Sequence, residues 1–226
     1  MLSFKKYIAA LLCLLLAASA LTLISCRGRT GNDKTAVTED TASEIAVIGE
    51  NSFYSTIELS EYVSLCEYKG LSLDISDTDG SRENMENAIK KHIFENSEIK
   101  KYPEAPLKYY FEQEKNFYMY LAKGDEKQYA ALLAEAGMSE NDFNDLAKKY
   151  VAEDLVFYAI TEAEGISVSD TEKAELFDKY VDEYVTSYGY TEEYVKENMT
   201  DLIYDSMLFD KTMEFLIANN TFVSEN

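Results

Sequence analysis

The stretch ISVSDTEKAELFDKYVDEYVTSYG, residues 166–189, decides the fold class of this chain. Ser169 and Glu172 have the spacing of a capping box, in which two side chains satisfy backbone N–H groups at a helix N-terminus. Apolar and aromatic residues then recur at helical spacing, and Gly189 is a typical helix stop. These residues are Phe177, Tyr180, Val181, Tyr184, Val185 and Tyr188. The segment is therefore predicted to be an amphipathic helix.

The same pattern covers most of the chain after Pro103, which predicts a mainly α fold. Helices are predicted over 106–123, with Pro106 at the first position, and over about 126–136, ending at Gly137. A long helix starts at the Ser139–Asp142 capping pattern and ends at Gly165. A last long helix is predicted from Thr191 through Leu216. Residues 103–226 are thus expected to form one elongated helical domain.

The segment before Pro103 is more β-prone. Residues 45–49 (IAVIG) and 62–75 (YVSLCEYKGLSLDI) contain alternating or β-branched residues, which favours strands. Residues 77–80 are predicted to be a turn and residues 81–97 a helix. Residues 45–102 therefore form a short β-prone segment followed by one helix.

The N-terminus has the layout of a secretory signal. Lys5 and Lys6 precede the apolar stretch 8–24, and Leu23-Ile24-Ser25-Cys26 looks like a bacterial lipobox. An uncleaved anchor helix is the alternative, but about 17 residues is short for a transmembrane span. The expected organisation is a lipoprotein signal peptide over 1–25, a lipidated (palmitate-carrying) Cys26 and a flexible tether over 26–44. The protein is then lipid-anchored on the extracytoplasmic face of the cell membrane, and Cys66 is a small buried side chain.

The charge of the chain limits its partners. The sequence has 21 Lys and Arg against 42 Asp and Glu, and removing the signal leaves 19 against 42. So acidic a body argues against binding nucleic acid. The hydrophobic content of 46% is too high for a disordered chain.

Two segments resemble trigger factor. Residues 62–75 resemble the YKG-containing entry to its prolyl isomerase domain, with Cys66 where that pattern often has glycine. Residues 163–223 follow the order of its C-terminal, SurA-like chaperone domain, from Gly165 to the ending Lys211, Phe215, Leu216 and Asn219. The resemblance covers roughly residues 60–223 and implies an elongated multi-helix trigger-factor/SurA-like chaperone domain with a short N-terminal β-prone segment.

The chain also departs from that family. The ribosome-docking signature is missing, and a secreted lipoprotein does not meet the ribosome. Only one helix fits between Gly70 and Pro103, whereas an isomerase domain needs on the order of 100 residues. The resemblance therefore implies a chaperone module without its isomerase.

The sequence offers no catalytic, cofactor or metal site. His92 is the one histidine, so a Ser-His-Asp arrangement would need it, yet it lies in a predicted amphipathic helix beside Lys90 and Lys91. Residues 75–86 partly mimic a calcium loop, but Ile75 stands where an oxygen ligand is needed. The protein is expected not to be an enzyme.

Tyrosine and methionine side chains are the candidate client-binding residues. Tyr109 and Tyr120 lie off the main apolar stripe of the 106–123 helix, and both suit weak contacts with many segments. Met199, Met207 and Met213 could add an adaptable surface. Packing within the domain explains either set as well.

The leading hypothesis is a membrane-tethered, extracytoplasmic chaperone-like lipoprotein that holds unfolded or secreted polypeptides without ATP. The alternative is a non-enzymatic adaptor or scaffold lipoprotein that binds one defined partner. An extracellular foldase with residual peptidyl-prolyl isomerase activity is a weaker third hypothesis.

Overall fold

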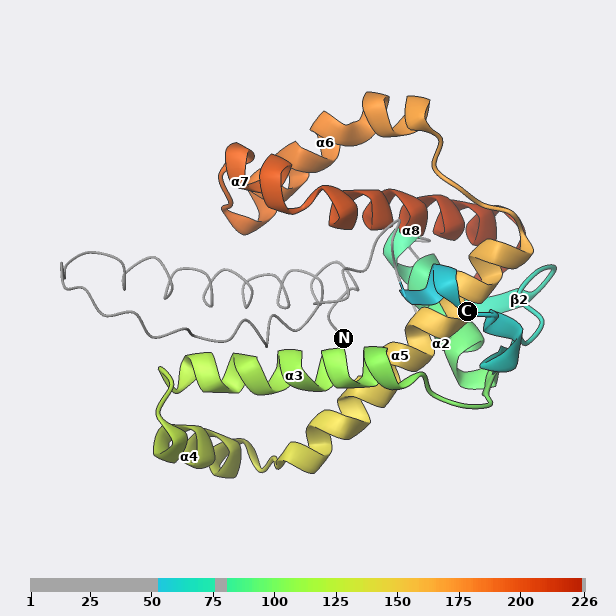
Figure 1. Ribbon diagram of the computed structural model, residues 1–226. Coiled ribbons are helices and arrows are strands. Elements are labelled where there is room, and N and C mark those ends of the chain that lie inside the picture. The colour runs from blue at the N-terminus through green and yellow to red at the C-terminus, as the bar shows by residue number, and fades with distance from the viewer. Residues whose placement is uncertain (1–52, 76–80, 225–226) are drawn as a thin grey trace. The chain divides into compact units, whose positions relative to one another are not determined.

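The computed structural model describes residues 53–75 and 81–224, and these are mainly helical (Figure 1). The described residues form two compact units. Residues 107–147 form the inserted unit, and the described residues before and after them form the main unit. The expected helical domain 103–226 therefore contributes to both units.

The elements follow one another as short β-prone pieces and then long helices. They are η1 Phe53–Thr56, η2 Leu59–Glu61, β1 Val63–Ser64, β2 Ser72–Ile75, α2 Arg82–Asn96, β3 Glu98–Ile99, α3 Glu104–Leu121, α4 Glu126–Ala136, α5 Glu140–Ala163, α6 Asp170–Tyr188, α7 Glu192–Asn198, α8 Thr200–Ala218 and β4 Thr221–Ser224. The mainly α prediction is confirmed.

The helix ends follow the local chemistry that the sequence shows. The capping box at Ser169 and Glu172 is present, and Gly189 ends α6 in the left-handed region at φ 74°. Asp125 caps α4 with its carboxylate, and Gly137 ends that helix at φ 65°. Left-handed backbone costs glycine little because it has no Cβ.

Three local predictions differ from the structure. The last helix is not continuous, because it breaks at Met199 into α7 and α8. Asn198 and Thr200 flank the break, and their side chains bond to backbone carbonyls at Tyr194 and Lys196, which competes with helix propagation. Strands β3 and β4 are not predicted, and Pro106 is the third residue of α3. Residues 45–49 and 77–80 lie outside the described residues.

The main unit is closed by pairing of distant strands. β1 pairs with β3 antiparallel, and β2 pairs with β4 in parallel, with Leu73 opposite Phe222. The side chain of Asn220 extends this pairing, since it accepts from the Leu71 N–H at 2.9 Å and donates to the Tyr68 carbonyl at 3.0 Å. Residues 68–75 and 219–224 are thereby joined.

The core of the main unit lies among α2, α5 and α8. Ile89 and Ile93 of α2, Leu155 and Ile160 of α5, and Ile203, Met213 and Leu216 of α8 are almost fully buried. Helix α6 lies alongside α8, and α7 connects them (Figure 1). Tyr180 donates to Asp210 at 2.7 Å, and the hydroxyls of Tyr184 and Ser206 lie 3.0 Å apart. These polar contacts fix the register of α6 on α8.

The inserted unit has a core of its own. Phe143 of α5 is fully buried there together with Ala122, Tyr129 and Leu133. The Tyr118 ring stacks on Phe143 with centroids 5.3 Å apart. An ion pair from Lys115 to Glu140 joins α3 to the start of α5 at 3.1 Å.

None of the helices in the described part of the chain is both long enough and apolar enough to cross a membrane. The predicted signal peptide, Cys26 and tether lie outside the described residues.

Replacing Asn220 with alanine is expected to lower the free energy of unfolding by about 2 kcal/mol, because a half-buried donor and acceptor lose their partner. The measurement is urea unfolding followed by circular dichroism. Asn219→Ala is the matched control, since that side chain bonds only within its own helix, to the Phe215 carbonyl. Equal losses for the two variants would contradict the role given to Asn220.

Candidate functional site

A cavity of about 350 Å³ opens in the main unit. It is lined by the η1 segment, the end of α5, the link 166–168, the start of α6 and the middle of α8. Most of its wall is apolar or aromatic, which is typical of ligand pockets. It is the candidate site because buried acidic groups meet aromatic rings there.

Helix α5 supplies one polar face of this region. Asp154 and Tyr158 are four residues apart, so they lie on the same side of the helix. Tyr54 of η1 packs against this face, with its ring stacked on that of Tyr158 at 5.0 Å and an interplanar angle of 18°. The Tyr54 hydroxyl donates to Asp154 Oδ2 at 2.9 Å. Both Tyr54 and Asp154 are buried, so this hydrogen bond positions η1 on α5.

Helix α8 supplies the second acidic residue, Asp205. The Tyr158 hydroxyl donates to Asp205 Oδ1 at 3.4 Å, which is a long hydrogen bond. Asp205 Oδ2 is buried and has no hydrogen-bond partner among the described residues. Asp205 lines the cavity, so the side chain there with an unmet hydrogen-bonding need is a carboxyl group.

Burial dominates the electrostatics of this cluster. Burial, reinforced by the charge of Asp154, raises the pKa of Asp205 to about 8, and the Tyr158 hydrogen bond only partly offsets this. Burial and the neighbouring Asp154 also hold the pKa of Tyr54 far above its usual value. At neutral pH Asp205 therefore carries a proton and Tyr54 stays a donor.

The ionisable groups that line the cavity include two carboxyl groups, Glu162 and Asp205, and one amine, Lys173. No group of three or more His, Cys, Asp or Glu residues suited to a metal ion occurs in the ranges that the structure describes. His92 lies on α2, outside the cavity lining, and its Nε2 is 2.9 Å from the Glu67 carbonyl oxygen. That contact ties α2 to the preceding loop.

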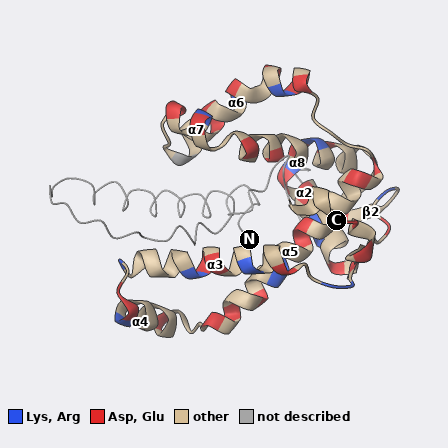
Figure 2. Ribbon diagram, viewed as in Figure 1, with Lys and Arg blue, Asp and Glu red and all other residues tan. Residues whose placement is uncertain are grey.

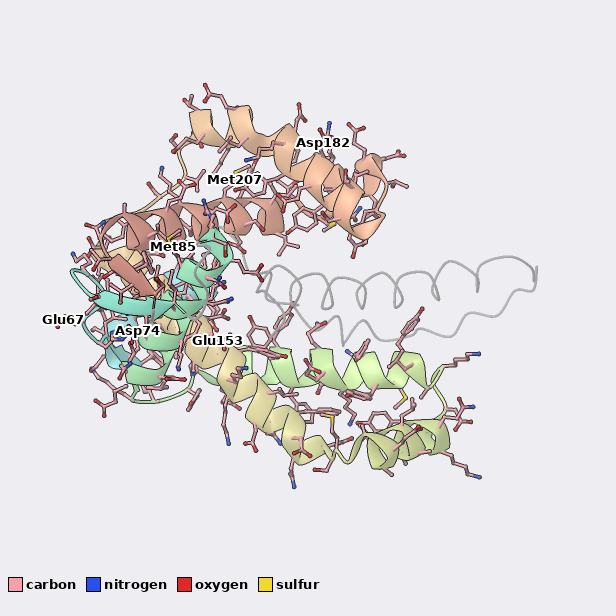
Figure 3. The ribbon with its side chains drawn as sticks, turned by 180° about the vertical axis from the view of Figure 1, so that it is seen from behind. Glu67, Asp74, Met85, Glu153, Asp182 and Met207 are labelled. Carbon is pink, nitrogen blue, oxygen red and sulfur yellow. The ribbon has the colours of Figure 1, made fainter. Side chains whose placement is uncertain are left out.

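The candidate client-binding residues fall into three environments. Tyr120 is 47% exposed, and Tyr109 is half-buried with its ring edge against Tyr110. Met199, Met207 and Met213 are buried in the main unit, and Figure 3 shows Met207 on α8. The three methionines are thus core residues of the described structure. They are large and apolar, so burial is their most favourable state.

Cys66 is half-buried, and its thiol is free. Its backbone N–H donates to Ser97 Oγ at 3.2 Å. The side chain lies near the Ile93 carbonyl, which places it between the loop and α2.

The acidic cluster of the cavity was not singled out from the sequence. Asp154 and Tyr158 lie near the buried Val151 and Leu155 of α5, and Asp205 lies in α8. An aspartate between Ile203 and Met207, both buried, is the one local signal for Asp205. No sequence signal indicates that Tyr54 packs on Asp154, 100 positions away.

Comparison of the chain with protein-family models, with curated proteins and with solved structures finds no match.

The free energy of unfolding is expected to fall less between pH 5 and pH 8 in Asp205→Asn than in wild type. The folded chain keeps a proton on Asp205 up to about pH 8, whereas the unfolded chain loses it near pH 4. The stability from this group is complete below pH 4 and is lost as pH rises to 8, by at most about 1.4 kcal/mol per pH unit. Urea unfolding at pH 5, 6.5 and 8 measures this difference between wild type and variant.

Asp182→Asn is the control, because Asp182 is an exposed carboxylate on α6 (Figure 3). It should leave the pH dependence of unfolding unchanged. If Asp205→Asn has the same pH profile as wild type, the buried, protonated state of Asp205 is contradicted.

Proposed function

We propose that this protein is a membrane-tethered, extracytoplasmic chaperone-like lipoprotein that holds unfolded or secreted polypeptides without ATP. It is proposed to use a trigger-factor/SurA-like helical body for this. The resemblance of residues 62–75 and 163–223 supports the proposal, together with one structural observation.

That observation is the adjacent exposed pair Tyr120 and Leu121 at the end of α3. Each side chain is 47% exposed. Single exposed apolar residues are ordinary on protein surfaces, whereas two large ones are exposed at this helix end, which is called the Tyr120–Leu121 patch below. Tyrosine and leucine together offer broad apolar contact and one polar tip. Such a patch suits weak contact with many unfolded segments.

The acidic surface supports the proposal that the protein keeps bound, unfolded clients from aggregating. Acidic side chains are spread along α5, α6 and α7 in Figure 2, with fewer basic ones among them. Further large apolar side chains stand exposed at Tyr102, Leu176 and Val223. A strongly acidic body keeps a complex with an apolar client in solution. No nucleotide is needed for this mechanism, because binding is a passive equilibrium.

The tether is part of the proposal. A diacylglycerol on Cys26 with a further acyl chain would contribute about 0.8 kcal/mol per buried CH₂, so two or three chains anchor a protein durably. The body would then work close to the membrane, where secreted chains emerge.

Tyr120→Ser combined with Leu121→Ser is expected to weaken binding of an unfolded client about tenfold. Losing both contacts costs on the order of 1–2 kcal/mol at a partly exposed surface. The measurement is suppression of the aggregation of several chemically denatured clients at increasing ratios. Wild type should suppress aggregation at near-stoichiometric ratios.

The control is the double variant Glu112→Ser with Asn116→Ser, since both residues are exposed on the same helix. It should behave as wild type. A well-folded wild-type chain that suppresses the aggregation of no client would overturn the holding function.

Cys26→Ser is expected to abolish incorporation of labelled palmitate and to release the protein from the membrane fraction. The reason is that the thioether forms only on that sulfur. Labelling and fractionation of expressing cells measure both effects. Cys66→Ser is the matched control and should keep label and location, and continued labelling of Cys26→Ser would refute the anchor.

The alternative is a non-enzymatic adaptor that binds one defined partner. The discrete cavity of the main unit favours it, because a shaped pocket with few polar groups selects one ligand group. Capture of one stoichiometric partner from membranes would support this alternative. No observation in the described residues supports a prolyl isomerase site, so that activity is not proposed.

A further inference from the structure

The cavity of the main unit combines three features that point to one ligand chemistry. It has aromatic walls, contributed by Tyr54, Tyr158 and Tyr204. It has the carboxyl group of Asp205, whose Oδ2 lacks a partner in the described part of the chain. It also has a volume of about 350 Å³, which admits a small organic group.

A positive charge already lies against this wall. The ammonium of Lys173 at the start of α6 is 4.7 Å from the centroid of the Tyr204 ring. Attraction between an ammonium and an aromatic face has that geometry. The neighbouring charges that raise the pKa of Asp205 are those of two other carboxyl groups, Asp154 and Asp201.

We propose that this cavity binds an alkylammonium group, with Asp205 as its counter-ion and the tyrosine rings as its walls. The group is either a free amine or the side chain of a lysine in a bound polypeptide. A carboxylate accepts from an ammonium with either oxygen, because its last torsion is broad and nearly two-fold. The cavity does not include Tyr120 or Leu121. The proposed amine binding can therefore be tested independently of the proposed holding function.

Burial gives the site a proton linkage. Without a ligand, Asp205 is protonated at neutral pH, since its pKa is about 8. An ammonium favours the charged carboxylate, so binding releases the proton of Asp205. The groups that face or surround Asp205 are Tyr54 on η1, Asp154, Tyr158 and Glu162 on α5, Lys173 on α6 and Asp201 on α8. Among these, the carboxylates favour an incoming cation, and Lys173 opposes it.

The test uses the full chain in a non-ionic detergent, titrated with n-butylammonium in a calorimeter at pH 6, 7 and 8. The neutral analogue 1-butanol is titrated in parallel. Wild type is expected to bind butylammonium about fiftyfold more tightly at pH 8 than at pH 6, which follows from one proton and a pKa of about 8. Titration in two buffers of different ionisation enthalpy is expected to show release of about one proton at pH 6.

Three variants make the test specific. Asp205→Asn is expected to bind at least about tenfold more weakly at pH 8, with no dependence on pH, because the charged partner is gone. Lys173→Met is expected to bind severalfold more tightly, because it removes the competing cation. Asp182→Asn, on an exposed part of α6, should match wild type.

Four results would overturn the proposal. They are absence of butylammonium binding to wild type, equal binding of 1-butanol, an unchanged pH dependence in Asp205→Asn, and weaker binding by Lys173→Met. The two sources of the ammonium are separated by a capped Gly-Lys-Gly peptide. Binding of this peptide with the same pH dependence identifies a lysine side chain, and binding of butylammonium alone identifies a free amine.

Discussion

The parallel pairing of β2 with β4 is the constraint on which the main unit depends. It joins residues 72–75 to residues 221–224, and Asn220 adds hydrogen bonds to Tyr68 and Leu71. Closing so long a loop has a large entropic cost, which the core of α2, α5 and α8 has to offset. Once closed, the pairing holds α8 against α5, and Asp205 is thereby brought to Tyr158.

The buried carboxyl group of Asp205 lowers the stability of the fold. Burying a carboxyl group with an unpaired oxygen is unfavourable, and a well-packed apolar residue at the same position would give a more stable fold. The Tyr54–Asp154 hydrogen bond is different, because both of its members are satisfied by each other and it fixes η1 on α5. Groups with strongly shifted pKa values are enriched at functional sites, and Asp205 is the group on which the proposal for the cavity rests.

The sequence was sufficient for the helices whose ends carry strong local signals. Ser169, Glu172, Gly137 and Gly189 act through bonds and dihedral angles within a few residues, so their roles can be predicted without a fold. The strand β4 could not be predicted, because its pairing with β2 is a tertiary contact, and no Gly or Pro in the sequence marks the break at Met199. Asp201 and Asp205, four residues apart, look alike in sequence, but only Asp205 is bonded by Tyr158 and has its pKa raised to about 8 by burial.

The order of the two units along the chain has a consequence for biosynthesis. The inserted unit is one continuous segment, residues 107–147, whereas the main unit needs residues on both sides of it and is complete only with residues 221–224. During synthesis or export, all core residues of the inserted unit emerge before α8 does. Helix α2, which contacts α8 in the folded main unit, lacks that partner until then. Chains fold in units as these become complete, so the nascent main unit exposes the apolar face of α2 until the C-terminus has emerged.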